Sequence, residues 1–329
     1  MTSQPTTDPN PVRSAPAPVI TGVVPPVCTP LADGAAAGTV AVDTGSLRRL
    51  VDYQLAGGVS GLFALGSSSE AAFLTRDARR LALQTIVERV GGRVPVLAGA
   101  IDMTTPRVLE HVADALAIGV DGIVVTAPFY TRTHPQEIAN HFRFIKDAVG
   151  SLPLFAYDLP VSVHIKLDTT LLLDLAAEGV LAGVKDSSGS DHSVRALVTG
   201  RNDFGLQGLS VLTGSEVTVD SAILYGADGV VPGLGNVDPA GYVRLVAAAK
   251  SGDAVAARLE QERLIKLFAI TAQGDLSRMG GGSAGLGGFK AALAMLGVID
   301  RHLMAPPQVP LNEAELDGVK ACLVQSGLL

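Results

Sequence analysis

The sequence contains few charged residues, few aromatic side chains and no tryptophan. Charged residues make up 17% of the 329-residue chain, and the net charge is −7 with a pI near 5.4. A net negative charge argues against nucleic acid and against an anionic membrane as partners. So low a charged fraction also favours an oligomer, in which part of the surface is buried.

The chain also lacks the patterns that signal metal, nucleotide or membrane binding. Its two cysteines, Cys28 and Cys322, lie almost a chain length apart and its six histidines are scattered, so we expect reduced thiols, a cytoplasmic protein and no metal site. No Gly-x-Gly-x-x-Gly motif follows the first predicted strand, and we expect no cofactor. No apolar run reaches about 18 residues, so no transmembrane helix is predicted. Residues 1–18 are rich in Pro, Thr, Ser and Ala without an apolar core, which predicts a disordered tail and not a signal peptide.

Apolar residues are abundant, and their order along the chain predicts the fold. They make up 47% of the sequence, enough for a sizeable core. Between residues 19 and 250, short apolar runs alternate with segments of helical periodicity, and several of these segments end at a glycine. The runs are residues 19–27, 61–65, 94–98, 122–126, 153–157, 180–185, 206–212 and 229–231. This alternation predicts an α/β fold of the (β/α)8 TIM-barrel type, with a doubly wound sheet as the alternative.

Beyond residue 250 the alternation stops. Residues 253–271, 289–296 and 312–325 have helical patterns, and we expect the segment 251–329 to pack on the barrel as a helical appendage. The glycine-rich segment 274–288 lacks the Lys-Ser/Thr ending of a phosphate-binding P-loop, so we interpret it as a flexible loop between helices.

Lys185 ends the sixth apolar run, where a charged side chain is unusual. Burying an ammonium costs free energy, and the same desolvation favours a neutral amine that can attack a carbonyl and form a Schiff base. The alternative is an ordinary lysine at a strand end, with its amine in solvent.

The active site of a TIM barrel lies at the carboxyl ends of its strands, and several polar residues fall at that position in this chain. Ser67, Ser68 and Ser69 follow the second strand, Tyr130 follows the fourth, and Tyr157 ends the fifth. Each taken alone has a structural explanation, as a turn, a loop anchor or a packing aromatic. Together they supply an amine, phenols for proton transfer, and hydroxyl and amide donors for a carboxylate, which is what Schiff-base chemistry on a 2-oxo acid requires.

These segments resemble the dihydrodipicolinate synthase and N-acetylneuraminate lyase superfamily of class I, pyruvate-type aldolases. Residues 66–70 (GSSSE) resemble its Gly-Thr/Ser-Thr-Gly-Glu carboxylate loop, 157–160 (YDLP) its Tyr-Asn-x-Pro motif, and 183–189 (GVKDSSG) its Schiff-base strand. Residues 125–130 (VTAPFY) resemble its Thr-Pro-Tyr-Tyr segment, and 229–237 (GVVPGLGNV) its eighth-strand loop. The likeness runs from residue 19 to residue 296 in the same order.

The resemblance implies a role for each matching residue. Lys185 would form the imine, Tyr157 would transfer protons, and Ser68 would relay protons to Tyr130, which in this family often enters from a neighbouring subunit. Ser67 and Ser68 would bind the pyruvate carboxylate, and the backbone around Val231 would contact substrate. A homodimer or homotetramer is therefore expected.

Two segments depart from the family pattern, the serine turn and residues 161–164. Ser69 stands where glycine is usual, and Ser68 keeps the hydroxyl of the more common threonine. Residues 161–164 (VSVH) replace the Ser-Arg-Thr-Gly of the synthases, so Ser162 stands in place of the arginine that binds the carboxylate of aspartate semialdehyde. Losing such a charge-assisted contact costs about 2 kcal/mol or more, although His164, Lys166 or Arg132 could substitute as the cation.

We therefore predict a class I lyase that reversibly cleaves a 2-oxo-3-deoxy acid to pyruvate and an aldehyde, similar to 2-keto-3-deoxygluconate aldolases. The alternatives are 4-hydroxy-tetrahydrodipicolinate synthase, which joins pyruvate to aspartate semialdehyde, and a dehydratase of 2-oxo-3-deoxy sugar acids using the same imine. A pyruvate-binding regulatory barrel without turnover is the alternative that is not an enzyme.

Overall fold

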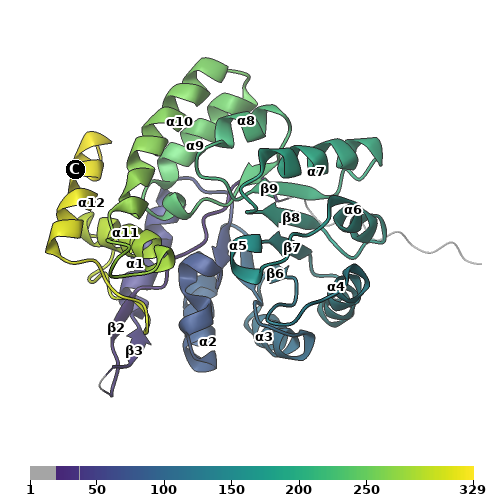
Figure 1. The fold of residues 1–329 in the computed structure, drawn as a ribbon, viewed down its shortest axis with the longest axis horizontal. Coiled ribbons are helices and arrows are strands. Elements are labelled where there is room, and N and C mark those ends of the chain that lie inside the picture. Colours follow the sequence, from purple (N-terminus) through teal and green to yellow (C-terminus); the bar gives the residue numbers. More distant parts are fainter. Residues whose placement is uncertain (1–19, 37) are drawn as a thin grey trace, which may run out of the picture.

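The computed structural model describes residues 20–36 and 38–329 and contains the predicted parallel barrel (Figure 1). The predicted tail, residues 1–18, lies outside the described residues. Eight parallel strands pair in the order β1-β10-β9-β8-β7-β6-β5-β4. Their bounds are β1 Gly22–Val23, β4 Leu62–Ala64, β5 Val96–Gly99, β6 Gly122–Thr126, β7 Leu154–Asp158, β8 Gly183–Asp186, β9 Ser210–Thr213 and β10 Gly229–Val230. A parallel bridge between Pro26 and Phe63 joins the chain after β1 to β4 and closes the barrel.

Helices surround this barrel, as the alternating sequence predicts (Figure 1). Thr75 caps one of them, because its hydroxyl accepts a hydrogen bond from the amide of Ala78. The helices are α1 Thr44–Ala56, α2 Arg76–Val90, α3 Thr105–Ile118, α4 Pro135–Val149, α5 Pro160–Val163, α6 Thr169–Ala177, α7 Asp191–Asp203, α8 Val219–Leu224, α9 Pro239–Lys250, α10 Ala254–Phe268, α11 Gly281–Met295 and α12 Glu313–Gln325. No helix in the described ranges is long and apolar enough to cross a membrane.

Alternation along each strand separates two layers of core. Residues such as Val125 and Val184 face outward and pack with the helices, whereas Val124 and Phe155 belong to a smaller cluster inside the barrel. Lys185 directly follows the outward-facing Val184, so its side chain is directed into the barrel. The strand period of two residues therefore places this lysine in the apolar interior.

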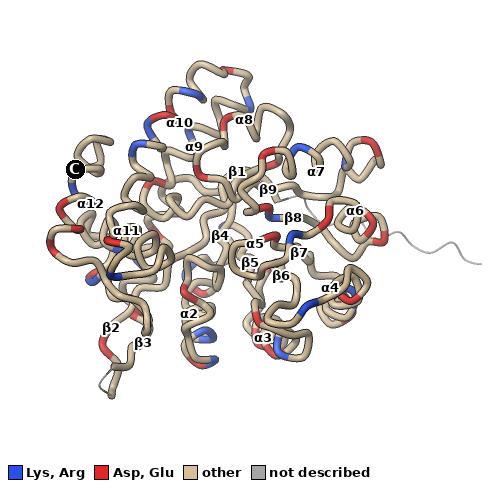
Figure 2. The backbone as a smooth tube through the Cα atoms, viewed as in Figure 1, with Lys and Arg blue, Asp and Glu red and all other residues tan. Residues whose placement is uncertain are grey.

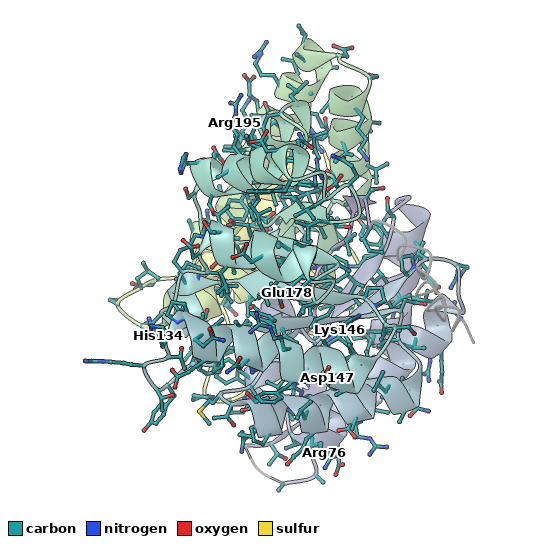
Figure 3. All side chains as sticks on the ribbon, turned by 90° about the vertical axis from the view of Figure 1, so that its right-hand side faces the viewer. Arg76, His134, Lys146, Asp147, Glu178 and Arg195 are labelled. Atoms are coloured by element: carbon teal, nitrogen blue, oxygen red, sulfur yellow. The ribbon has the colours of Figure 1, made fainter. Side chains whose placement is uncertain are left out.

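Charged residues lie mainly on the helices (Figure 2). The side view in Figure 3 shows Lys146 and Asp147 on α4 and Glu178 at the end of α6 on the outer surface. There, Arg143 of α4 makes a bidentate pair with Glu178, with both distances 2.8 Å. An exposed pair of this kind contributes little free energy, so burial of the apolar layers is the main source of stability.

The structure differs from the sequence-based prediction in three places. A two-stranded antiparallel hairpin, β2 Leu31–Asp33 and β3 Val40–Val42, precedes α1 and was not predicted. The sequence also favours Ser215, which follows the seventh apolar run, as the N-cap of the next helix, but that helix begins after Thr218 and the Ser215 hydroxyl accepts from the amide of Val217. Residues 281–288, predicted as flexible loop, form the first half of α11, because small residues let this helix approach its neighbours closely: Gly288 has no room for a Cβ beside the carbonyl of Ile270.

Candidate active site

Lys185 lies inside the barrel at the carboxyl end of β8, paired in register with Tyr157 of β7. Its side chain is 5% exposed. Its Nζ lies 4.0 Å from the centre of the Tyr157 ring and 4.9 Å from that of Phe63. Among the described residues no carboxylate lies within ion-pair distance of this Nζ. In the described part of the chain the amine is therefore held against aromatic faces without a carboxylate counter-ion, so no ion pair has to be broken before it reacts with an electrophile.

Tyr157 is buried beside this amine. Its hydroxyl lies 3.3 Å from the hydroxyl of Ser67, and its ring packs edge-on against Phe63 with centroids 6.0 Å apart. Burial raises the pKa of Tyr157, whereas the positive charge of Lys185 and hydrogen bonding by Ser67, Lys185 and Ser187 lower it. The lowering effects are larger together, so the pKa of Tyr157 lies below its usual value. A phenol with a lowered pKa next to a buried amine is suited to proton transfer.

The serine-rich segment forms a single turn of 3-10 helix, η1 Ser67–Ser69, at the end of β4. Ser68 is 8% exposed, and Ser69 donates its hydroxyl to the carbonyl of Val27 at 2.5 Å. Ser69 therefore replaces the family's glycine by bonding the neighbouring backbone behind the turn. The hydroxyl of Ser67, in contrast, bonds Tyr157.

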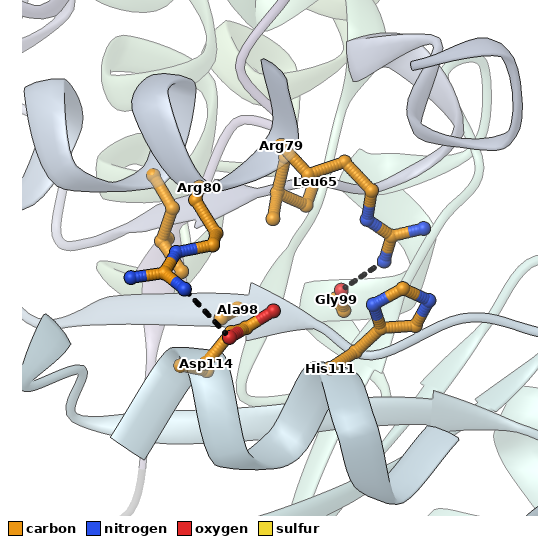
Figure 4. Close-up of a pocket in the computed structure, with 9 residues that line it drawn as sticks. Leu65, Arg79, Arg80, Ala98, Gly99, His111 and Asp114 are labelled. Carbon is orange, nitrogen blue, oxygen red and sulfur yellow. Dashed lines mark hydrogen bonds and ion pairs between the residues drawn. The ribbon is translucent and has the colours of Figure 1, made fainter. Parts of the chain in front are cut away.

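Two buried ionic groups hold this turn. Glu70, at φ +56°, forms an ion pair with Lys290 of α11 and accepts a 2.7 Å hydrogen bond from the amide of Ala305. Arg79 of α2 donates to the carbonyls of Gly99 and Ala71, as the close-up in Figure 4 shows for Gly99. Burial lowers the pKa of Arg79 to about 10. The turn is thus held by the barrel on one side and by a C-terminal helix on the other.

Tyr130 is not brought to Ser68 within the chain. It follows β6 at φ +79°, and its side chain is 89% exposed. A left-handed backbone conformation at a non-glycine residue costs free energy. Here that conformation accompanies a phenol side chain that projects into solvent. The predicted contribution of Tyr130 to a neighbouring subunit's site stays a prediction.

Val231 is buried inside the barrel, where its amide donates to the carbonyl of Thr213. The loop that follows it, including the 3-10 turn η3 Gly233–Asn236, is held by Glu216, which accepts hydrogen bonds from the amide of Gly233 and from the hydroxyl of Tyr242. Burial raises the pKa of Glu216 to about 7, against the lowering effect of these donors. Sequence reasoning missed Glu216, although its position after the seventh strand was a usable signal.

A second missed group lies next to the strand-end tyrosine and lysine. Asp158 follows Tyr157 and Asp186 follows Lys185. The two aspartates pair in register across β7 and β8, and both are buried. Lys166 forms an ion pair with Asp158 and lies 3.9 Å from Asp186, whose other contacts are the hydroxyl of Ser193 and the amide of Ser188. This network fixes the ends of β7 and β8, and with them the separation of the candidate catalytic side chains.

A cavity of about 340 Å³ lies beside the serine turn and is lined by Ser67 and Ser162. None of the three cations considered as substitutes for the missing arginine, Arg132, His164 and Lys166, is among its lining residues. Lys166 is engaged by the two buried carboxylates, and the other two are exposed. In the described ranges no cluster of three or more His, Cys, Asp or Glu is arranged to hold a metal.

The chain matches one protein family over nearly its whole length. The model of the dihydrodipicolinate synthetase family matches residues 20–326. A curated relative, 4-hydroxy-tetrahydrodipicolinate synthase of Anaeromyxobacter dehalogenans strain 2CP-C, is 32% identical over 303 residues, which cover 92% of this chain and 96% of the relative. The relatives' names thus match the synthase considered as an alternative, not the 2-keto-3-deoxygluconate aldolase that was the main prediction.

Solved structures show the same fold. Dihydrodipicolinate synthase from Bacteroides thetaiotaomicron superposes with a TM-score of 0.85 at 28% identity, covering 93% of this chain and 98% of that one. YagE, a prophage protein of the dihydrodipicolinic acid synthase family from E. coli K12 in complex with pyruvate, gives a TM-score of 0.85 at 28% identity over 95% of this chain and 100% of that one.

Proposed function

The chain belongs to the dihydrodipicolinate synthetase family, and on this basis we propose that Lys185 forms the imine with pyruvate in a reversible aldol reaction with an aldehyde. Members of this family are class I lyases that form a lysine Schiff base, so the protein is an enzyme of that type. The observation that carries the residue assignment is the buried Lys185 Nζ, which has no carboxylate partner among residues 20–36 and 38–329 and lies 4.0 Å from the ring centre of Tyr157.

The proposed reaction begins with attack of the Lys185 amine on the 2-oxo carbon of pyruvate. Tyr157 protonates the carbinolamine oxygen, which leaves as water, and the imine forms. Loss of a proton from the methyl carbon gives an enamine, and that carbon then bonds to the aldehyde carbon. Because Tyr157 bonds Ser67 and lies beside Lys185, one phenol can serve both proton transfers.

The carboxylate of pyruvate is assigned to the serine turn. Ser67 and Ser68 offer hydroxyls and backbone amides at the start of the 3-10 turn, close to Tyr157. Neutral donors of this kind can hold an anion in a buried site without a cation. The backbone at Val231 is proposed to contact the substrate as well, because Val231 belongs to the same cluster inside the barrel as Tyr157.

The exposed Tyr130 supports an oligomeric enzyme. A phenol that is 89% exposed at a strained backbone position is suited to insertion into a partner's site, where it would meet that subunit's Ser68. A homodimer or homotetramer is the proposed state, and the cytoplasmic location expected from the sequence stays a prediction. One structural neighbour, at TM-score 0.84 and 25% identity, is a monomeric dihydrodipicolinate synthase variant.

The aldehyde is the open part of the assignment. The relatives' names favour aspartate semialdehyde, and this synthase reaction is the second candidate function. The serine at position 162 and the absence of any cation lining the adjacent cavity favour a different aldehyde. Cleavage of a 2-oxo-3-deoxy sugar acid and its dehydration use the same imine and remain alternatives for the assay.

Borohydride reduction in the presence of pyruvate tests the imine. We expect the intact mass to rise by one reduced pyruvate adduct, with peptide mapping placing it on Lys185, and no adduct in Lys185→Ala. A wild-type protein that stays unmodified, or a Lys185→Ala variant with full activity, would refute the mechanism. A regulatory barrel without turnover would form the adduct and yet consume no aldehyde.

A further inference from the structure

The cavity beside the serine turn has mainly apolar walls. Its apolar lining comes from three regions of the chain: the turn after β4, the ends of β5 to β7, and α11. The larger of these side chains are Phe73, Ile101, Phe129, Leu159, Val163 and Leu286. A volume of about 340 Å³ lies at the lower end of the range for small-molecule sites and accommodates a short aliphatic chain or one ring.

The cavity offers no net charge to a ligand. Lysine, arginine and histidine are missing from its lining in the described part of the chain. Its single acidic residue, Glu70, is neutralised by the ion pair with Lys290, and one of its oxygens accepts from the amide of Ala305. A substrate carboxylate placed here would lose its hydration without gaining a counter-ion.

Neutral hydrogen-bonding groups are nevertheless available. The Thr126 hydroxyl and the Gln308 side-chain oxygen belong to the lining residues, are buried, and have no hydrogen-bond partner in the described structure. Buried polar atoms normally find a partner, so these two can orient a single hydroxyl or carbonyl of a ligand. With Ser67 assigned to the pyruvate carboxylate, the only other side-chain hydroxyl in the lining, among the described residues, is that of Ser162. These groups are few for the several hydroxyls of a sugar-derived aldehyde.

The cavity adjoins the reacting centre. Ser67 lines it, and the same hydroxyl lies 3.3 Å from the Tyr157 hydroxyl. Thr126 ends β6 and pairs in register with Tyr157, while Leu159 and Ser162 follow Tyr157 in the chain. Lys185 and Tyr157 are not among the lining residues, so Ser67 is the link between the cavity and the reacting centre. An aldehyde whose side chain fills the cavity would have its carbonyl directed past Ser67 toward the enamine on Lys185.

We propose that the acceptor is an aldehyde with an uncharged, apolar side chain, an inference that rests on the imine chemistry proposed above. The enamine carbon forms a bond to the aldehyde carbon, and the aldehyde oxygen takes up the proton released when the enamine formed. Water then hydrolyses the imine, which frees Lys185 and releases a 4-hydroxy-2-oxo acid with an apolar tail. The reverse reaction cleaves such an acid to pyruvate and the apolar aldehyde.

Two aldehydes of the same shape test this proposal. 4-Methylpentanal and succinic semialdehyde differ in that an isopropyl group replaces the carboxylate, and glyceraldehyde represents the hydroxylated class. Each is incubated with pyruvate and the purified protein, and the 4-hydroxy-2-oxo acid is quantified by mass spectrometry. We expect kcat/KM for 4-methylpentanal to exceed that for either polar aldehyde by roughly 100-fold.

A pair of arginine variants locates the effect in the cavity. Ser162→Arg adds a cation to the lining, whereas Val161→Arg adds the same cation one residue away, on a side chain that is 77% exposed and outside the lining. We expect Ser162→Arg to raise kcat/KM for succinic semialdehyde roughly tenfold or more and to lower it for 4-methylpentanal. Val161→Arg should leave both values within about twofold of wild type.

The outcomes separate this inference from the imine mechanism. If pyruvate is trapped on Lys185 but succinic semialdehyde or glyceraldehyde is the better acceptor, the apolar assignment is wrong and the mechanism stands. An equal gain from both arginine variants also overturns the assignment, because the cation would then act by general attraction. If no pyruvate adduct forms, both proposals fail together.

Discussion

The buried ion pair between Glu70 and Lys290 gives a sharp prediction for Lys290→Met. Both side chains are 0% exposed, so methionine fills a similar volume but leaves the Glu70 carboxylate buried with only the Ala305 amide to bond it. Breaking a buried pair from one side costs about 3–5 kcal/mol. The lysine also donates to the carbonyl of Leu303 at 2.7 Å, and the loss of this bond acts in the same direction.

Urea unfolding followed by circular dichroism measures this loss. The matched control is Arg258→Met, which breaks an exposed pair with Glu262 on α10 and should change the free energy of unfolding by less than about 0.5 kcal/mol. The double variant Glu70→Gln with Lys290→Met removes the uncompensated charge, and we expect it to recover at least half of the loss. A Lys290→Met protein as stable as the control, or a double variant no more stable than the single one, would contradict the assignment of a buried, mutually neutralising pair.

Three further predictions concern the site itself. Tyr157→Phe removes the hydroxyl but keeps the ring beside Lys185, so we expect kcat to fall by roughly 10²–10⁴-fold while the circular dichroism spectrum stays unchanged. A kcat within a few fold of wild type would exclude Tyr157 as the proton-transfer group. Because the pKa of Glu216 is raised to about 7, the free-energy penalty for burying its carboxylate is absent below the ordinary glutamate pKa near 4.5 and grows as the pH rises to about 7. In urea unfolding, Glu216→Gln should therefore gain stability relative to wild type by up to about 3 kcal/mol between pH 4.5 and 8. A stability difference that does not change with pH would contradict the raised pKa. Tyr130→Ala removes an exposed side chain, so we expect the free energy of unfolding to change by no more than about 0.5 kcal/mol. In the same variant we expect kcat to fall and the oligomer to dissociate more readily in analytical ultracentrifugation. Unchanged kcat and assembly would show that Tyr130 does not complete a partner's site.

The barrel could be predicted from the sequence because its signals are local and repeated. Each helix-to-strand joint carries its own glycine or cap, and each strand is a short apolar run, so errors at single boundaries do not change the topology. The hairpin of β2 and β3 was missed because each strand has three residues and only one of them is buried, Leu31 in β2 and its partner Val42 in β3. Residues 281–288 were misassigned because glycine is a poor helix former, and only close packing against Ile270 and Leu311 makes a helix favourable there.

For the candidate site, too, residues signalled by the local sequence could be predicted, whereas residues whose role depends on distant partners could not. Ser67, Tyr157 and Lys185 could be proposed from the sequence because each lies at or just after the end of a recognisable strand, and the carboxyl ends of parallel strands converge. Their catalytic roles stay predictions. Glu216 and the pair of Asp158 with Lys166 were overlooked because their significance comes from burial and from partners distant in sequence. Tyr130 was correctly located on its loop, but no rule of local sequence says that its side chain is directed into solvent.

The sequence by itself determined the alternation of strands and helices, the order of the strand-end residues and the presence of a lysine where the barrel interior begins. These follow from periodicity, from turn chemistry and from the two-residue repeat of a strand, all of which act over a few residues. Only the tertiary structure decided which charges are neutralised and what surrounds the substrate. Segments more than a hundred residues apart come together in the pairing of Glu70 with Lys290 and in the uncharged cavity beside Ser162. Electrostatic free energy depends on the distance between groups in space and on their burial, not on their positions in the chain.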